Sequence, residues 1–169
     1  MKKETYRKMI AFSGRTKFRR EVIVRFCKRT PLLILAIYIG FITFLALIQS
    51  TKIILFLAVP AVDFLFITFL RATLNRPRPF EVFQIDPLLP HKRGKSFPSR
   101  HTASAFIIGM ACLYINITFG ILVLVMAAIV GFTRILTGLH FTRDVIFSAL
   151  FSLILGALGF FVLGHFIFV

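Results

Sequence analysis

Five apolar stretches in this sequence are each close to the length that an α-helix needs to cross a lipid bilayer. An α-helix rises about 1.5 Å per residue, so about 20 apolar residues span the hydrocarbon core. The stretches cover residues 31–48, 53–70, 102–117, 119–132 and 145–169. A soluble domain of this length would not be 58% hydrophobic with a mean hydropathy of +0.90. The sequence therefore predicts an all-α fold, a polytopic membrane helix bundle with about five transmembrane helices.

Residues 1–29 form a basic segment that precedes the first apolar stretch. They hold eleven of the 21 lysines and arginines, against the two acids Glu4 and Glu21. Apolar residues alternate with the basic ones, which suits an amphipathic helix at the membrane interface and equally a disordered tail. We therefore divide the chain into a basic N-terminal tail or interfacial helix (residues 1–29) and a membrane-embedded domain (residues 30–169).

The net charge of +15 favours binding partners that are negatively charged. A basic flank before a first span is typical of a cytoplasmic N-terminus and attracts anionic lipids. Nucleic-acid binding is the other interpretation of such a charge. Because the basic segment runs directly into an apolar span, we expect anionic membrane lipids and no nucleic acid as partners. The protein is then a multi-pass protein of the cell membrane.

The connections between the spans predict where the charges lie. The connection 71–100 contains five of the seven prolines, so it is not one continuous helix. With five spans, this connection, the segment 133–144 and the N-terminus fall on one side of the membrane. The short turns and the C-terminus fall on the other side, where Lys52 is the one basic residue. Any site built from these connections is expected on the cytoplasmic face.

Three polar clusters lie on the charged side. In the first, His140 and Asp144 are four residues apart at the start of the last span, and a helix places such residues on one face. A carboxylate beside an imidazole fixes its tautomer and leaves the other ring nitrogen free to attack. A solvated helix end could contain the same pair, so the pair alone identifies no site.

The second cluster, Ser99-Arg100-His101, directly precedes the third span. Ser99 or a neighbour can cap this helix, whose free N–H groups would bind an anion. An ordinary helix cap is the alternative. An arginine at a helix start is opposed by the helix dipole, and a bound anion would remove that objection.

The third cluster consists of arginines near span ends. Arg71 and Arg78 follow the second span, and Arg134 lies six residues before His140. Arginine forms bidentate pairs with phosphate oxygens, although arginines at span ends also reach lipid headgroups. A buried charge among apolar neighbours, as at Arg134, requires a partner.

Together the clusters are more specific than any one of them. In order they give Arg71, six residues, Arg78-Pro79; Pro98-Ser99-Arg100-His101; and Thr133-Arg134, five residues, His140, three residues, Asp144. This resembles the signature of the type 2 phosphatidic acid phosphatase family, Lys-x6-Arg-Pro, Pro-Ser-Gly-His and Ser-Arg-x5-His-x3-Asp. Bacterial acid phosphatases and vanadium haloperoxidases belong to the same family. The resemblance covers about residues 63–148.

The resemblance implies a metal-independent, two-step phosphoryl transfer without a cofactor. His140 would be the nucleophile that forms a phosphohistidine, Asp144 would orient it, and His101 would protonate the leaving oxygen and then activate water. The implied phosphate-binding residues are Arg71, Arg78, Ser99, Arg100 and Arg134. The implied enzyme hydrolyses a lipid phosphomonoester or diphosphate. Phosphatidylglycerophosphate, phosphatidic acid and undecaprenyl diphosphate are the candidate substrates.

Three positions depart from the family pattern. Arg71 replaces lysine, Thr133 replaces serine, and Arg100 replaces glycine where a backbone would approach phosphate. These changes motivate the alternative of a catalytically silent lipid-binding or assembly protein that retains the fold. A metal site of His101, His140 and Asp144 is disfavoured, because the arginines would repel a cation.

Asp63 is the one acid inside an apolar stretch. A carboxylate within a membrane span suggests a functional role, and a structural hydrogen bond is the alternative. A transporter would be expected to carry more such groups and an internal repeat, and neither is visible in this sequence.

Overall fold

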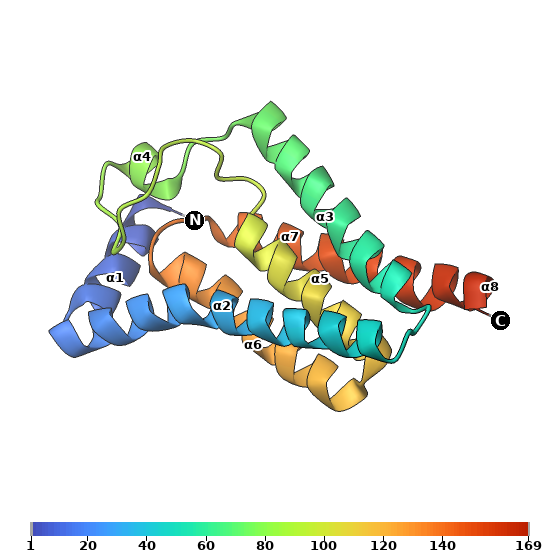
Figure 1. The fold of residues 1–169 in the computed structure, drawn as a ribbon. Helices are drawn as coiled ribbons and strands as arrows, with labels where there is room; N and C mark the ends of the chain where they lie inside the picture. The colour runs from blue at the N-terminus through green and yellow to red at the C-terminus, as the bar shows by residue number, and fades with distance from the viewer. Residues whose placement is uncertain (1, 169) are drawn as a thin grey trace.

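The computed structural model describes residues 2–168, and over this range it contains helices and no strands. Figure 1 shows their arrangement. In chain order they are α1 (Lys3–Gly14), α2 (Lys17–Leu47), α3 (Ile53–Leu74), α4 (Pro79–Phe83), α5 (Arg100–Ile115), α6 (Ile117–Leu136), α7 (Thr142–Gly156), the π-helical η1 (Ala157–Leu163) and α8 (Gly164–Phe168). The segments α7, η1 and α8 continue one another as a single helical run. The predicted all-α fold is confirmed.

The bundle is organised around α5, which contacts α2, α3, α6 and α7. Its side chains contribute to both apolar cores, for example Ile107 to one and Ala105 to the other. The outer helices expose large apolar side chains, such as Leu47 at 79%. A face of this kind is stable against lipid and not against water. The structure is that of a multi-pass membrane protein.

Four helical segments are long and apolar enough to cross a membrane: α2, α3, α6 and the run from α7 to α8. The remaining predicted span, residues 102–117, corresponds to α5, which has 16 residues and is shorter than the other four segments. Because its neighbours enclose it, α5 does not face the lipid along its whole length. The last residue of the predicted fifth span, Val169, lies outside the described residues.

The basic N-terminal segment is helical. After α1, Thr16 caps α2 by accepting a hydrogen bond from the Arg19 N–H at 3.2 Å. Helix α2 then continues through residue 29 into the apolar stretch without a break. Residues 17–29 therefore belong to the same helix as the first span, and the predicted division at residue 30 is not a helix boundary. Whether α1 lies at a membrane interface stays a prediction.

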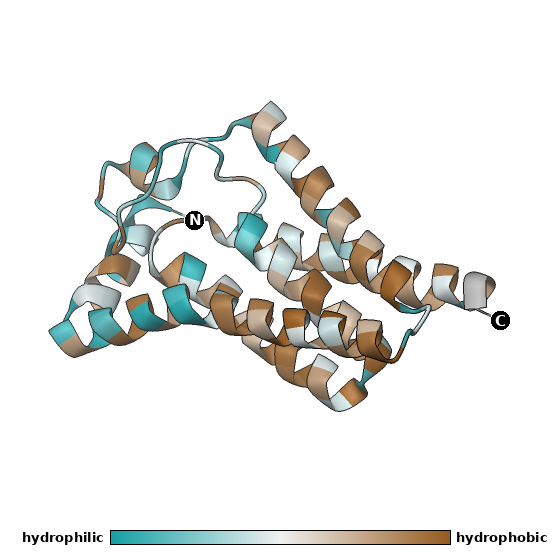
Figure 2. Ribbon diagram, viewed as in Figure 1, coloured by the Kyte–Doolittle hydropathy of each residue, from teal (hydrophilic) through white to brown (hydrophobic). Residues whose placement is uncertain are grey.

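The polar residues gather at one end of the bundle (Figure 2). This end holds α1, α4, the long connection between α3 and α5, and the connection between α6 and α7 (Figure 1). The turn between α2 and α3 and the end of α8 lie at the opposite end. The arrangement is the one expected from the span count, while the membrane face to which each end belongs stays a prediction.

Two prolines within helices leave carbonyl groups that another helix satisfies. Proline has no N–H, so the carbonyl four residues earlier loses its helical partner. Pro60 frees the Phe56 carbonyl of α3, and the Tyr38 hydroxyl of α2 donates to it at 2.8 Å. An unpaired carbonyl would be costly in lipid. The Tyr38 bond therefore ties α2 to α3 at the site of the proline.

This pairing predicts a coupling between Tyr38 and Pro60. Tyr38→Phe is expected to lower the free energy of unfolding by about 1–2 kcal/mol, because the Phe56 carbonyl is left unpaired. In the Pro60→Ala background the N–H of the alanine donates to the Phe56 carbonyl, so Tyr38→Phe lowers the free energy of unfolding by less. Denaturation of the four proteins in mixed micelles measures the coupling. Equal losses in both backgrounds would contradict this interpretation.

Candidate active site

Asp144 and His140 lie side by side in the buried part of the polar end. The start of α7 places Asp144 in its first turn, one turn after His140. The His140 Nδ1 atom is 3.8 Å from the Asp144 Oδ2 atom, and the two side chains are 3% and 0% exposed. This carboxylate also accepts hydrogen bonds from the Phe141 N–H at 3.1 Å and the Ser96 hydroxyl at 2.6 Å. The predicted pairing of His140 with Asp144 is present.

The other ring nitrogen of His140 faces a buried arginine. Arg78 Nη1 lies 3.4 Å from His140 Nε2 and donates to the Leu139 carbonyl at 3.0 Å, while Arg78 Nε donates to the Gly94 carbonyl at 3.0 Å. Glu81 of α4 holds the same loop by accepting from the backbone N–H groups of Arg78 and Gly94. Arg78, only 2% exposed, is thus fixed beside the imidazole.

Arg71, at the end of α3, contacts the start of the second cluster. Its Nη1 donates to the Pro98 carbonyl at 2.8 Å, next to Ser99. The Ser99 N–H donates to the Ser148 hydroxyl of α7 at 2.7 Å. The three sequence clusters therefore meet through hydrogen bonds between α3, the start of α5 and α7.

The predicted cap of α5 by the Ser99 side chain is not formed. Ser99 occupies the N-cap position, but its hydroxyl pairs with the Thr102 hydroxyl at 2.9 Å instead of a backbone N–H. Thr102 stands at the third position of the helix, where its hydroxyl competes with its own N–H for the serine oxygen. The free N–H groups of the first turn of α5 therefore keep no side-chain acceptor.

Arg134 reaches the cluster from the end of α6. Its Nη2 donates to the Cys27 carbonyl at 3.2 Å, which Pro31 leaves free within α2. Its Nε atom is buried without a hydrogen-bond partner in the described part of the chain. The Arg134 carbonyl accepts from the His140 N–H at 3.3 Å, so the two residues are adjacent. This arginine keeps donor capacity for a further acceptor.

His101 lies at the start of α5 and lines two cavities. One, of about 310 Å³, is basic: it is lined by His101, Arg134, His91 and Lys28, together with Cys27, Pro31, Leu32, Leu89, Pro90 and Leu139. The second, of about 280 Å³, opens among α2, α3 and α5 and is mostly apolar. His101 therefore stands between a basic chamber lined by Arg134 and a mostly apolar groove.

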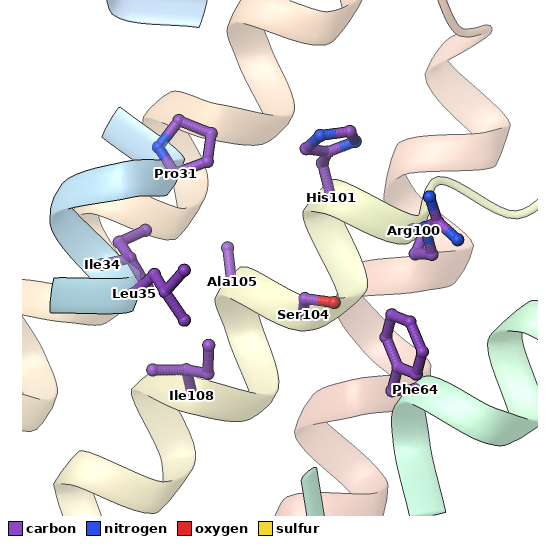
Figure 3. A pocket seen from close by; sticks show the side chains of 9 residues that line it. All are labelled: Pro31, Ile34, Leu35, Phe64, Arg100, His101, Ser104, Ala105 and Ile108. Carbon is purple, nitrogen blue, oxygen red and sulfur yellow. The ribbon is translucent and has the colours of Figure 1, made fainter. Parts of the chain in front are cut away.

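Arg100 departs from the expected arrangement. Its guanidinium carbon lies 5.6 Å from the centroid of the Phe64 ring on α3, and it lines the apolar groove. Figure 3 shows it on the α5 wall of that groove, above Phe64. The structure thus gathers His140, Asp144, Arg71, Arg78 and Ser99 into one cluster of hydrogen bonds and close contacts, with Arg134 and His101 beside it. The side chain of Arg100 is turned toward α3.

Three residues of this network were not identified from the sequence. Ser96 donates to Asp144, Ser148 accepts from the Ser99 N–H, and Glu81 holds the loop around Arg78. Ser148 is four residues after Asp144 on a helix and could have been found from that spacing. Ser96 and Glu81 reach the site through the fold of the long connection, for which the sequence has no periodic pattern.

Asp63 belongs to a separate buried pair. The Ser152 hydroxyl donates to Asp63 Oδ1 at 2.8 Å, and both residues are fully buried between α3 and α7. The structural hydrogen bond, the alternative to a functional role for Asp63, is present, and Asp63 is not among the residues that line either cavity at His101.

The electrostatics of the cluster favour an anion. Burial lowers the pKa of His140 to about 4, with Arg78 and Arg71 acting in the same direction and Asp144 opposing. Partial burial and the neighbouring Arg78 and Arg134 lower the pKa of His91 to about 4. Both imidazoles are therefore neutral near pH 7, and the fixed positive charge comes from arginines. No group of three or more His, Cys, Asp or Glu side chains with metal-binding geometry occurs among residues 2–168.

Comparison with known proteins gives one family. The PAP2 superfamily model matches residues 51–166, which include all three polar clusters. Undecaprenyl-diphosphatase BcrC of Bacillus subtilis (strain 168) is 34% identical over 113 residues, 66% of this chain and 58% of that protein. Bacitracin transport permease protein BcrC of Bacillus licheniformis is 37% identical over 70 residues, 41% of this chain and 34% of that protein. The chain thus spans less than two thirds of the length of these curated relatives.

Two solved structures share the fold. The crystal structure of Aquifex aeolicus LpxE superimposes with a TM-score of 0.73 at 23% identity, covering 92% of each chain. The first transmembrane PAP2 type phosphatidylglycerolphosphate phosphatase from Bacillus subtilis gives a TM-score of 0.70 at 24% identity, covering 97% of this chain and 83% of that one. At these identities the likeness concerns the arrangement of helices.

The Ser96 hydrogen bond predicts a large effect for a small substitution. Ser96→Ala removes a donor from a fully buried carboxylate, so the free energy of unfolding should fall by about 1.5–3 kcal/mol. Thr73→Ala is the matched control, because the Thr73 hydroxyl bonds only the Phe69 carbonyl of its own exposed helical turn. Denaturation in micelles compares the two. Equal, small losses would show that Ser96 does not support Asp144.

Proposed function

The chain belongs to the PAP2 superfamily, and from that premise we propose that it is a membrane lipid phosphatase acting through a phosphohistidine. The resemblance to type 2 phosphatidic acid phosphatases found in the sequence is confirmed by the family match. One observation carries the proposal. His140 Nε2 faces Arg78 at 3.4 Å, while His140 Nδ1 faces the buried Asp144 carboxylate at 3.8 Å.

The orientation of His140 suits a nucleophile. The Asp144 carboxylate favours the tautomer with a proton on Nδ1, so the Nε2 lone pair points toward the arginines. The low pKa of the buried ring keeps this lone pair free near neutral pH. The 3.8 Å separation from Asp144 is longer than a hydrogen bond, and such bonds often tighten only when substrate is present.

In the first step, His140 Nε2 attacks the phosphorus and the bond from phosphorus to the leaving oxygen breaks. His101, as the imidazolium, donates a proton to that oxygen and becomes neutral. Arg71, Arg78 and Arg134 offset the charge of the phosphoryl oxygens, with backbone N–H groups at the start of α5 as further donors. Phosphoryl transfer depends mainly on such positioning and positive charge.

In the second step, the neutral His101 accepts a proton from water, and the water oxygen attacks the phosphorus of the phosphohistidine. The bond from phosphorus to Nε2 breaks, inorganic phosphate leaves, and both histidines return to their initial state. Asp144 stabilises the positive charge on the His140 ring while the phosphoryl group is attached. No step in this scheme uses a metal ion or another cofactor.

The relatives support a lipid as the substrate. Their names include an undecaprenyl-diphosphatase and a phosphatidylglycerolphosphate phosphatase. The cavities at His101 support it too, since a basic chamber adjoins an apolar groove. We propose a lipid phosphomonoester or diphosphate, with phosphatidylglycerophosphate, phosphatidic acid and undecaprenyl diphosphate as the candidates. A catalytically silent lipid-binding protein is the alternative, favoured by the replacement of the family glycine by Arg100.

The proposal predicts phosphate release from at least one of the three lipids, in detergent and with a metal chelator present. His140→Ala is expected to abolish release, because the nucleophile is lost. His101→Ala should lower kcat by about 10²–10⁴, the range of general acid–base catalysis. His165→Ala is the matched control at the opposite end of the bundle and should leave turnover unchanged.

The alternative gives a different result. In that case the folded parent releases no phosphate from any of the three lipids, and lipid binding survives His140→Ala. This result would reject the phosphatase and support the silent lipid-binding protein.

A further inference from the structure

The groove beside Arg100 is apolar over most of its length and charged at one end. Its walls are Pro31, Ile34 and Leu35 of α2, Phe64 of α3, and the α5 face of Ala105 and Ile108 (Figure 3). At its polar end stand Arg100, His101 and Ser104. Helices α2 and α3 meet at their short turn and diverge toward the polar end (Figure 1), and residues of both helices line the groove at the start of α5.

The groove and the basic chamber meet at His101 and Pro31, which line both. A lipid with its chain in the groove and its terminal phosphate in the basic chamber, beside Arg134, would therefore pass His101. The atoms that join the chain to the scissile phosphate would then lie at the polar end of the groove. Arg100 is the one arginine or lysine among the residues that line this groove.

The position of Arg100 is unfavourable for a cation without an anion. It is the first residue of α5, where the helix dipole opposes positive charge. Its guanidinium lies over the Phe64 ring in a cation–π contact and takes part in no salt bridge or side-chain hydrogen bond within residues 2–168. This contact uses the face of the ring and leaves the N–H donors of the guanidinium free to bind an acceptor.

We propose that Arg100 binds the phosphate nearest the lipid chain of a lipid diphosphate and so selects diphosphates over phosphomonoesters. The inference rests on the proposed phosphatase function and adds a substrate class and a specificity residue to it. In a phosphomonoester the same place is taken by the uncharged carbon of the ester. In a diphosphate it is taken by an anionic phosphate, which a guanidinium recognises bidentately.

The same contact assists the reaction of a diphosphate. The bond from the terminal phosphorus to the bridging oxygen breaks, and this oxygen stays on the lipid monophosphate with the proton from His101. Negative charge develops on the departing phosphate during this step. A guanidinium next to His101 can bind the phosphate oxygens over which that charge spreads, whereas an ester leaving group has only the one oxygen that His101 protonates.

The test compares two substrates that differ by one phosphate. The values of kcat/KM for farnesyl diphosphate and farnesyl monophosphate are measured in detergent for the parent, Arg100→Ala and Arg100→Lys. Arg76→Ala is the matched control: its guanidinium also stacks on a phenylalanine ring, that of Phe97 at 5.1 Å, at the same end of the bundle. Arg76 does not line the groove or the basic chamber.

We expect the parent to prefer the diphosphate and Arg100→Ala to lower the ratio of the two kcat/KM values by about tenfold or more. Arg100→Lys should keep part of the preference, and Arg76→Ala should keep all of it. Phe64→Leu removes the ring that orients the guanidinium and should also lower the ratio, which gives a second test should Arg100→Ala fail to fold.

Two results would overturn the inference while the phosphatase function stands. One is a parent that prefers the monophosphate. The other is an Arg100→Ala protein in which both rates fall equally or neither changes, because a purely structural role moves both rates together. A folded parent that hydrolyses neither these compounds nor the three candidate lipids would overturn the proposed function, and this inference with it.

Discussion

The buried carboxylate of Asp144 is the interaction on which the polar end of this protein depends. It accepts from the Ser96 hydroxyl and the Phe141 N–H, and it stands 3.8 Å from the His140 ring. An isolated carboxylate without water would be unstable, so these donors and the surrounding arginines are required for its burial. The Asp144 side chain therefore holds together the connection between α3 and α5, the His140 ring and the start of α7.

A second constraint comes from the backbone. Within a membrane every carbonyl needs a partner, and prolines in helices leave some carbonyls without one. Pro60 and Pro31 free the carbonyls of Phe56 and Cys27, and both are satisfied by side chains from other helices. The second of these, Arg134, belongs to the candidate site. The first span therefore positions a site residue although its own sequence carries no part of the family signature.

Local sequence patterns predicted the helices of this molecule better than the structure of the segments that connect them. The apolar stretches indicated the helices, and the four-residue spacing of His140 and Asp144 indicated their common face. The cap that Ser99 could have supplied to α5 is not formed, because the Ser99 hydroxyl pairs with the Thr102 hydroxyl. The Ser96 contact and the turn of Arg100 toward Phe64 depend on how distant segments pack, and no periodicity in the sequence encodes that.

The central claim is that the three polar clusters form one site in which His140 carries the phosphoryl group. Rapid quenching of the protein during turnover of a lipid radiolabelled in its terminal phosphate tests this most directly. We predict a label that is stable in alkali and labile in acid, located on the peptide that contains His140. The same measurement is made on the parent, at quench times shorter than one catalytic cycle, and on the His101→Ala protein. Phosphate release with no label on His140 in either protein would contradict the account.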